Sequence, residues 1–176
     1  MSILHEIEAA IPALRRYAHA LVRDRDRADD LVQDCLERAI ARRHDWRGEG
    51  AVQAWLFRIL LNRHRDLLRG QPAGHLVAVE DLPAEPAQPG GQDGHMALRE
   101  VHEAMGRLPA DQRAALLLVA VEGQSFDQAA DLLGIPRGTL MSRLARARAS
   151  LRALTGRSGP QPAPARPGQP GRTVKP

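Results

Sequence analysis

Residues 126–144 read FDQAADLLGIPRGTLMSRL, and this stretch decides the fold. Its apolar side chains at 126, 129, 130 and 133 fall on one face of a short helix. Gly134 then supplies a left-handed turn, Ile135 fills that turn, and Pro136 stands where a second helix can begin. The small Ala130, four residues before the glycine, lets the two helices approach each other. The pattern predicts a helix-turn-helix unit.

The second helix of this unit has an apolar face and a basic face. At 100° per residue, Leu140 and Leu144 belong to a stripe that faces the core. Five arginines and no acidic residue lie between positions 137 and 152, which suits contact with bases and phosphates in the major groove. The candidate DNA-binding residues are Arg137, Thr139, Ser142, Arg143 and Arg146. The structural alternative is a solvated basic helix face.

Periodic apolar residues predict further helices on both sides of an irregular stretch. Upstream, they indicate helices over about 3–21, after the polar segment 24–30, and over about 52–68. Downstream, residues 96–154 hold about four helices, and nothing alternates as a strand would. Residues 70–95 are acidic and rich in proline and glycine.

The predicted fold is therefore all-α, with two small helical domains. They cover residues 1–69 and 96–154, joined by a flexible acidic linker at 70–95. From residue 155 to 176 the chain is mostly glycine, proline, arginine and glutamine, so we expect a disordered tail.

Composition excludes several classes of protein. A single cysteine, Cys35, rules out a disulfide framework, and its place on an apolar stripe predicts a buried thiol. We expect a cytoplasmic protein, because neither a membrane span nor a signal peptide is recognisable. The seven histidines form no metal-ligand pair, and no nucleophile–base arrangement or phosphate-binding loop occurs. We expect no enzyme, and neither catalytic residues, metal, cofactor nor small-molecule substrate.

The helix from Val52 carries one narrow polar stripe on an otherwise apolar surface. Arg58, Asn62, Arg65 and Arg69 lie within about 60° of each other, where they can follow a phosphate backbone or read bases. All but one of the 25 basic residues are arginine, which fits phosphate contact and equally fits GC-rich codon usage.

Three residues beside this stripe have more than one interpretation. Arg63 falls on the apolar side and needs an acidic partner, either Asp66 or an acid on the preceding helix. Trp46 and Trp55 flank a glycine-rich loop. We expect Trp55 to be a core anchor, while Trp46 is either another anchor or a platform for an unpaired base.

The preceding helix is acidic at its start and basic at its end. Its outer side carries Asp29, Asp30, Gln33, Asp34 and Glu37. This order complements the helix dipole, and it also suits a charged docking surface for another protein.

Several motifs, in order along the chain, resemble those of one family. RADDLVQ at 27–33 and AWLFRILLN at 54–62, followed by Asp66 and Arg69, resemble conserved region two of the extracytoplasmic-function (ECF) sigma factors of bacterial RNA polymerase. Leu108-Pro109, Gln112-Arg113 and GTLMSRLARAR at 138–148 resemble region four. The resemblance spans about residues 4–154. Each motif is weak alone, but together and in order they are specific.

The resemblance implies a role for each surface. Asp29, Asp30, Gln33, Asp34 and Glu37 would dock on the clamp helices of core RNA polymerase. Trp46, Asn62, Arg65 and Arg69, with the loop at 46–53, would recognise and open the minus-ten box of promoter DNA around a flipped base. The helix from Arg137 would read the minus-thirty-five box, and the linker would run toward the RNA exit path.

The resemblance also implies an anti-sigma factor as a partner, which would hold the protein in the cytoplasm or at the membrane until a stress or envelope signal arrives. Two alternatives belong to other classes. One is an autonomous helix-turn-helix regulator that dimerises through its first domain. The other is a sigma-like mimic that sequesters an anti-sigma factor. Retention of Arg65, Arg69, Arg143 and Arg146 argues against a mimic.

Overall fold

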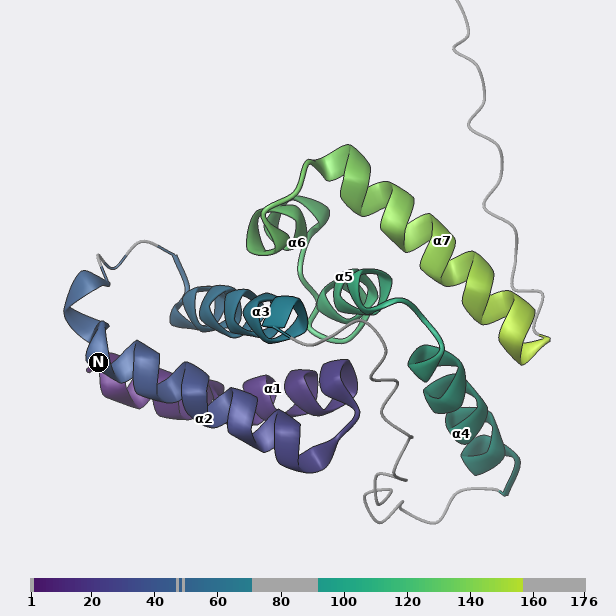
Figure 1. The fold of residues 1–176 in the computed structure, drawn as a ribbon, viewed down its shortest axis with the longest axis horizontal. Coiled ribbons are helices and arrows are strands. Elements are labelled where there is room, and N and C mark those ends of the chain that lie inside the picture. Colours follow the sequence, from purple (N-terminus) through teal and green to yellow (C-terminus); the bar gives the residue numbers. More distant parts are fainter. Residues whose placement is uncertain (1, 47, 49, 71–91, 157–176) are drawn as a thin grey trace, which may run out of the picture.

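The protein is all-α, as the sequence predicts. The computed structural model describes residues 2–46, 48, 50–70 and 92–156, and within these ranges it contains helices and no strand (Figure 1). The helices are α1 (Ile3–Val22), α2 (Arg25–Ala41), the short 3₁₀ helix η1 (Arg43–Asp45), α3 (Val52–Gly70), α4 (Gln92–Gly106), α5 (Ala110–Ala120), α6 (Phe126–Leu133) and α7 (Arg137–Thr155).

Helices α1, α2 and α3 pack on one another as a bundle. Burial of aliphatic side chains drives this packing, and the Tyr17 and Phe57 rings meet edge to face at 5.1 Å between centroids. Asp24 caps α2 by accepting a hydrogen bond from the Arg27 amide at 2.9 Å, as the polar segment at 24–30 predicts.

Helices α4 to α7 form the second group, with α5 and α6 packed against α7. The helix-turn-helix follows from local chemistry. Ser125 and Gln128 form a capping box at the start of α6, and Gly134 ends that helix with a φ of 61°. Leu140 and Leu144 are fully buried, so the apolar stripe of α7 faces the core as predicted.

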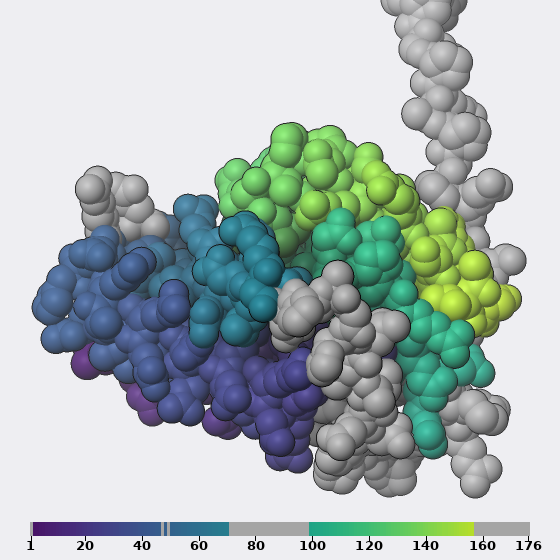
Figure 2. All heavy atoms as spheres, viewed as in Figure 1, coloured from purple at the N-terminus to yellow at the C-terminus, as the bar shows by residue number. Residues whose placement is uncertain are grey.

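The two groups lie against each other. α5 contacts α1, and α6 contacts α3, although each pair is far apart in the sequence. In the space-filling view α3 lies beside the C-terminal group of helices (Figure 2). We use "the seam" for this boundary between α1–α3 and α4–α7.

The segment between α3 and α4 is shorter at both ends than the predicted linker. α3 continues to Gly70, and α4 begins at Gln92, inside the range 70–95. Gly94 indicated a break, but one glycine within a helix costs only about 1 kcal/mol. Residues 71–91 of the linker and 157–176 of the tail lie outside the described residues. Thr155 and Gly156, which were expected to belong to the tail, finish and cap α7.

None of the helices in the described ranges is both long and apolar enough to span a membrane.

Candidate nucleic-acid and polymerase interfaces

The candidate DNA-binding face of α7 is largely open to solvent. Thr139, Ser142 and Arg146 are exposed. Arg137 is also exposed, and its Nη1 donates to both carboxylate oxygens of Asp127, at 2.9 and 3.1 Å. This pair ties the first turn of α7 to α6, so the two helices present the face as one unit.

Arg143 differs from its neighbours on this face. The sequence predicts an exposed side chain, but only 25% of it is exposed, and its Nε lies 3.2 Å from Oδ2 of Asp111 on α5. The helical wheel places Arg143 correctly on the polar side. It cannot show that the start of α5 lies close to that side.

The polar stripe of α3 is divided between solvent and the seam. Arg58, Asn62 and Arg69 are exposed, whereas Arg65 is half-buried. Arg65 donates from Nη1 to Asn62 Oδ1 at 3.0 Å and from Nη2 to the Leu133 carbonyl at 2.6 Å. That carbonyl belongs to the last turn of α6, where helix carbonyls have no partner within the helix. The second contact was not predicted.

Arg63 resolves one of the alternatives left open by the sequence. Its Nε donates to Asp34 Oδ2 on α2 at 2.6 Å, while Asp66 lies 3.8 Å from Arg69. The acid is therefore the one on the preceding helix. The pair ties α3 to α2 beside the candidate docking surface.

Of that docking surface, Asp29, Asp30, Gln33 and Glu37 are exposed and Asp34 is half-buried. Gln33 Nε2 donates to Glu37 Oε1 at 3.0 Å. A hydrogen bond with the His19 ring, 2.9 Å away, lowers the pKa of the Asp29 carboxyl. The lowered pKa favours the charged form of the Asp29 carboxyl at the exposed surface.

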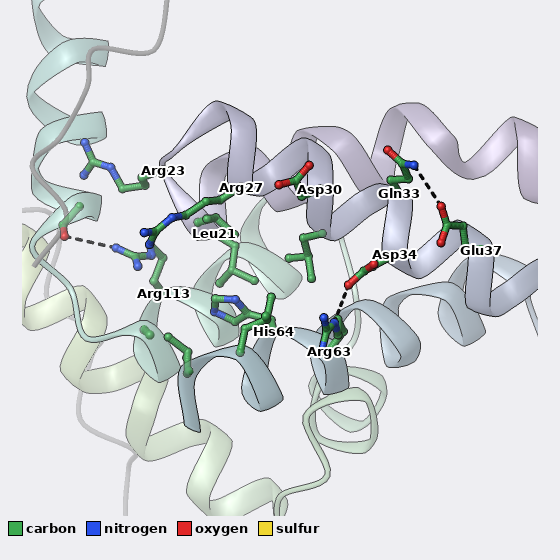
Figure 3. Close-up of a pocket in the computed structure, with 16 residues that line it drawn as sticks. Leu21, Arg23, Arg27, Asp30, Gln33, Asp34, Glu37, Arg63, His64 and Arg113 are labelled. Atoms are coloured by element: carbon green, nitrogen blue, oxygen red, sulfur yellow. Dashed lines mark hydrogen bonds and ion pairs between the residues drawn. The ribbon is translucent and has the colours of Figure 1, made fainter. Parts of the chain in front are cut away.

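A groove of about 690 Å³ begins at this surface and ends at the seam. Asp30, Asp34 and Glu37 lie toward one end of it, while Arg23 and Arg113 lie at the other (Figure 3). His64 lies between these ends. Burial, followed by the charges of Arg113 and Arg65, lowers the pKa of His64 to about 4.

The two tryptophans lie together at the glycine-rich loop. Their ring centroids are 5.4 Å apart, and both are half-buried and packed against the core. This agrees with the expected anchoring of Trp55. Trp46 packs in the same way and keeps part of its ring accessible. Between them, Gly48 and Gly50 adopt φ values of 73° and 82°.

Cys35 is fully buried, as predicted, and burial raises the pKa of its thiol to about 12. No group of His, Cys, Asp or Glu side chains within the described ranges is arranged to hold a metal ion.

Known families match both halves of the chain. The model described as the Sigma2 domain of PhyR matches residues 7–61, and the model of Sigma-70 region 4 matches residues 98–151. The chain is 41% identical to the ECF RNA polymerase sigma factor EcfG of Rhodopseudomonas palustris, over 87% of this chain and 84% of that protein. It is 36% identical to the ECF sigma factor SigM of Mycobacterium tuberculosis, over 81% of this chain and 71% of that protein.

A similar solved structure is the sigma factor RpoE of Bartonella quintana in complex with the anti-sigma factor NepR. It matches with a TM-score of 0.74 and 34% identity, covering 88% of this chain and 97% of that one. The helix-turn-helix, the basic face of α7 and these relatives agree. The chain belongs to the ECF family of RNA polymerase sigma factors, which direct core polymerase to promoters and initiate transcription.

Proposed function

We propose that each surface described above performs one step of promoter recognition. α2 docks on core polymerase, α3 with the Trp46 loop binds the minus-ten box, and α7 reads the minus-thirty-five box. The observation that carries this proposal is the face of α7, where Thr139, Ser142 and Arg146 are exposed on a helix whose opposite stripe is fully buried. Such a helix can enter the major groove without losing its packing.

The proposed docking surface is acidic and preorganised. Asp29 and Glu37 are held by His19 and Gln33, and Asp34 is held by Arg63. These contacts fix the positions of the carboxylates before a partner arrives. Fixed charges favour a basic partner surface through complementarity and faster association.

The proposed minus-ten surface combines the exposed Asn62 and Arg69 with the partly accessible ring of Trp46. Arginines contact phosphates, and an aromatic ring can stack on an extruded base. Arg65 belongs to this surface by its place on the stripe, but its Nη2 is bonded to α6 in the present arrangement.

We also propose an anti-sigma factor as a partner, a cytoplasmic location and a role in a stress response. Two relatives support the partner, since the sigma factor RpoE was solved with NepR and CnrH was solved with the cytosolic domain of CnrY. The mimic alternative has less support. The structures of PhyR proteins are 17% to 22% identical to this chain, whereas a sigma factor is 41% identical.

The test of this function is open-complex formation. The protein is mixed with core polymerase, promoters are mapped by run-off transcription from genomic DNA, and opening at a mapped promoter is followed by permanganate reactivity. We expect opening only when both proteins are present. Protection of a symmetric duplex by the protein alone, with no contribution from polymerase, would favour the autonomous regulator. Binding to an anti-sigma factor without any opening would favour the mimic.

Arg143→Ala tests the assignment of α7. We expect it to weaken holoenzyme binding to the upstream duplex by about tenfold, the effect of losing one good base contact, with the affinity for core polymerase unchanged. Fluorescence anisotropy measures both affinities. Arg152→Ala is the matched control, because Arg152 is an exposed arginine in the last turn of the same helix. Equal loss of both affinities in Arg143→Ala would contradict the assignment.

A further inference from the structure

Two arginines of α7 are each paired with an aspartate, but through different atoms. Arg137 gives its Nη1 atom to both carboxylate oxygens of Asp127, so the end of its guanidinium is engaged. Arg143 approaches Oδ2 of Asp111 through Nε, at 3.2 Å. The described residues provide no hydrogen bond to the two Nη atoms of Arg143. The Asp111 pair therefore leaves the end of the Arg143 guanidinium available to another partner.

Asp111 is itself held in place by the start of α5. It stands in the first turn of that helix, where a carboxylate is stabilised by the helix dipole. Its Oδ1 accepts a hydrogen bond from the Gln112 amide at 2.9 Å, which leaves Oδ2 for Arg143. Pro109 at the N-cap makes no side-chain cap hydrogen bond, so the Asp111 carboxylate supplies an acceptor to this end of the helix. One carboxylate thus joins α5 to an arginine of α7.

The exposure of this pair argues against a role in stability alone. The side chains of Arg143 and Asp111 are 25% and 50% exposed, and ion pairs with that much access to water contribute little to folding. Both residues belong to α4–α7, so the pair does not depend on how that group packs against α1–α3. At 100° per residue, Arg143 lies within about 60° of the exposed Thr139 and Arg146. The pair therefore borders the face that we propose enters the major groove.

The chemistry of the guanidinium gives this arrangement a use. A guanidinium can form paired hydrogen bonds either along its Nε side or through the fork of its two Nη atoms. Asp111 lies on the Nε side of Arg143, and the fork matches the O6 and N7 acceptors of guanine in the major groove. Holding a long side chain before it binds reduces the rotamer freedom that binding removes. It also leaves fewer orientations in which the arginine can accept a different base.

We propose that Asp111 is a positioning residue for base readout, which holds Arg143 so that its Nη fork meets a guanine of the upstream box. The inference rests on the proposed function of α7. Asp111 contacts no base in this proposal, and its negative charge repels the phosphates of any DNA sequence. Asp111 therefore weakens general DNA binding and improves the choice of sequence. A carboxylate that only repelled phosphates would change affinity without changing that choice.

Asp111→Asn is the principal variant, because it removes the charge and keeps a side-chain oxygen that can accept from Gln112. Asp131→Asn is the matched control, since Asp131 is exposed on α6 and has no ion-pair partner among the described residues. Both variants remove one negative charge from α4–α7. Asp111→Asn is also made in the Arg143→Ala protein, which shows whether its effect passes through Arg143.

The readout is sequence discrimination by each holoenzyme at one fixed salt concentration. Fluorescence anisotropy gives the Kd for a mapped upstream-box duplex, for a scrambled duplex, and for duplexes in which each G·C pair of the box is replaced in turn. The discrimination ratio is the Kd for the scrambled duplex divided by the Kd for the box. Thermal unfolding of each variant is measured beside it.

We expect Asp111→Asn to lower the discrimination ratio by about threefold, less than Arg143→Ala, because the guanidinium itself remains. The loss should be confined to one G·C pair of the box. Binding to the scrambled duplex should tighten to the same extent in Asp111→Asn and Asp131→Asn, since both lose one negative charge. Asp131→Asn should keep the wild-type ratio, and Asp111→Asn should not lower the ratio further in the Arg143→Ala protein.

A wild-type ratio in Asp111→Asn would overturn the positioning role, as would a loss spread over the whole box. An equal loss in the Arg143→Ala protein would also overturn it, because the effect would then come from altered folding or charge and not from Arg143. These results leave the proposed function intact if the wild-type holoenzyme prefers the box. Equal binding of box and scrambled duplex by the wild-type holoenzyme overturns the proposed function of α7 itself.

Discussion

The interior of the α1–α3 bundle and the seam show two ways of joining helices. Within the bundle, Leu14, Phe57 and Leu60 are fully buried and pack against other apolar groups. Across the seam, the hydrogen bonds among the described residues have arginine or tyrosine donors, and several buried nitrogens lack a partner. The bundle interior is mainly apolar, whereas the polar groups buried at the seam are only partly hydrogen-bonded.

This difference distinguishes contacts that are lost only on unfolding from contacts that can be exchanged while the helices stay folded. Apolar burial in a closely packed interior is lost only when the bundle unfolds. Arginine contacts to carbonyls can be exchanged for water or for phosphate, since both offer oxygen acceptors. We therefore expect the polar contacts of the seam to break more easily than the apolar packing of the bundle interior. The following predictions test this contrast, from the largest expected effect to the smallest.

The bundle interior should be costly to damage. Phe57→Ala removes a fully buried ring that meets Tyr17, and we expect the free energy of unfolding to fall by about 3–5 kcal/mol. Urea denaturation followed by circular dichroism measures the loss. Arg58→Ala is the control, because the neighbouring Arg58 side chain is exposed. A loss below about 1 kcal/mol for Phe57→Ala would contradict the contrast between the bundle interior and the seam, because a loss of that size is typical of a surface site.

The free energy of unfolding should depend on pH through His64, which lines the groove that ends at the seam and is 9% exposed. Its folded pKa of about 4 lies below the ordinary value of 6.5. As the pH falls below 6.5, the unfolded chain takes up a proton that the folded protein does not. His64 should therefore lower the free energy of unfolding by about 2 kcal/mol between pH 7.5 and pH 5.

Urea midpoints at the two pH values measure this loss, and the comparison with His64→Gln separates it from the contribution of the carboxylates. We expect the variant to lose less stability than the wild type over this interval. His5→Gln is the control, because the His5 side chain is 68% exposed. Parallel pH profiles for the wild type and His64→Gln would show that His64 does not carry the effect.

Local helix caps should contribute least to the free energy of unfolding. Ser125→Ala removes one half of the capping box of α6, and we expect a loss of about 1 kcal/mol. Ser2→Ala is a matched control, since Ser2 stands at the N-cap of α1 without a side-chain cap hydrogen bond. Thermal unfolding measures both variants. If the two serines have equal effects, the cap geometry of α6 contributes nothing of its own.

Local chemistry explains which parts of the fold could be predicted. Gly134 sets the turn between α6 and α7 because a left-handed residue is needed there, and this requirement is visible in a single sequence. The partner of Arg63 could be narrowed to Asp66 or an acid on the preceding helix, since a charge on an apolar face needs a countercharge. Both inferences depend on neighbours within a turn or on an adjacent helix.

The seam could not be predicted in the same way. Arg16 donates to Glu122 across the seam, yet the two residues are 106 positions apart and neither stands out in the sequence. Arg65 bonds to a backbone carbonyl, which no residue type reveals. Helical periodicity shows that Arg143 and Arg65 are on polar faces, but the packing of α5 beside α7 and of α6 beside α3 decides how much of each face meets water. The DNA and polymerase roles of the candidate residues stay predictions.

The tryptophan pair gives the protein a built-in optical probe. The chain has two tryptophans, and they are Trp46 and Trp55, whose rings lie 5.4 Å apart beside the glycine-rich loop. All indole emission therefore originates at one place, the loop proposed to hold the opened strand. A base that stacks there changes the surroundings of both rings at once. Strand capture can thus be timed by intrinsic fluorescence in unlabelled protein, separately from events at α7.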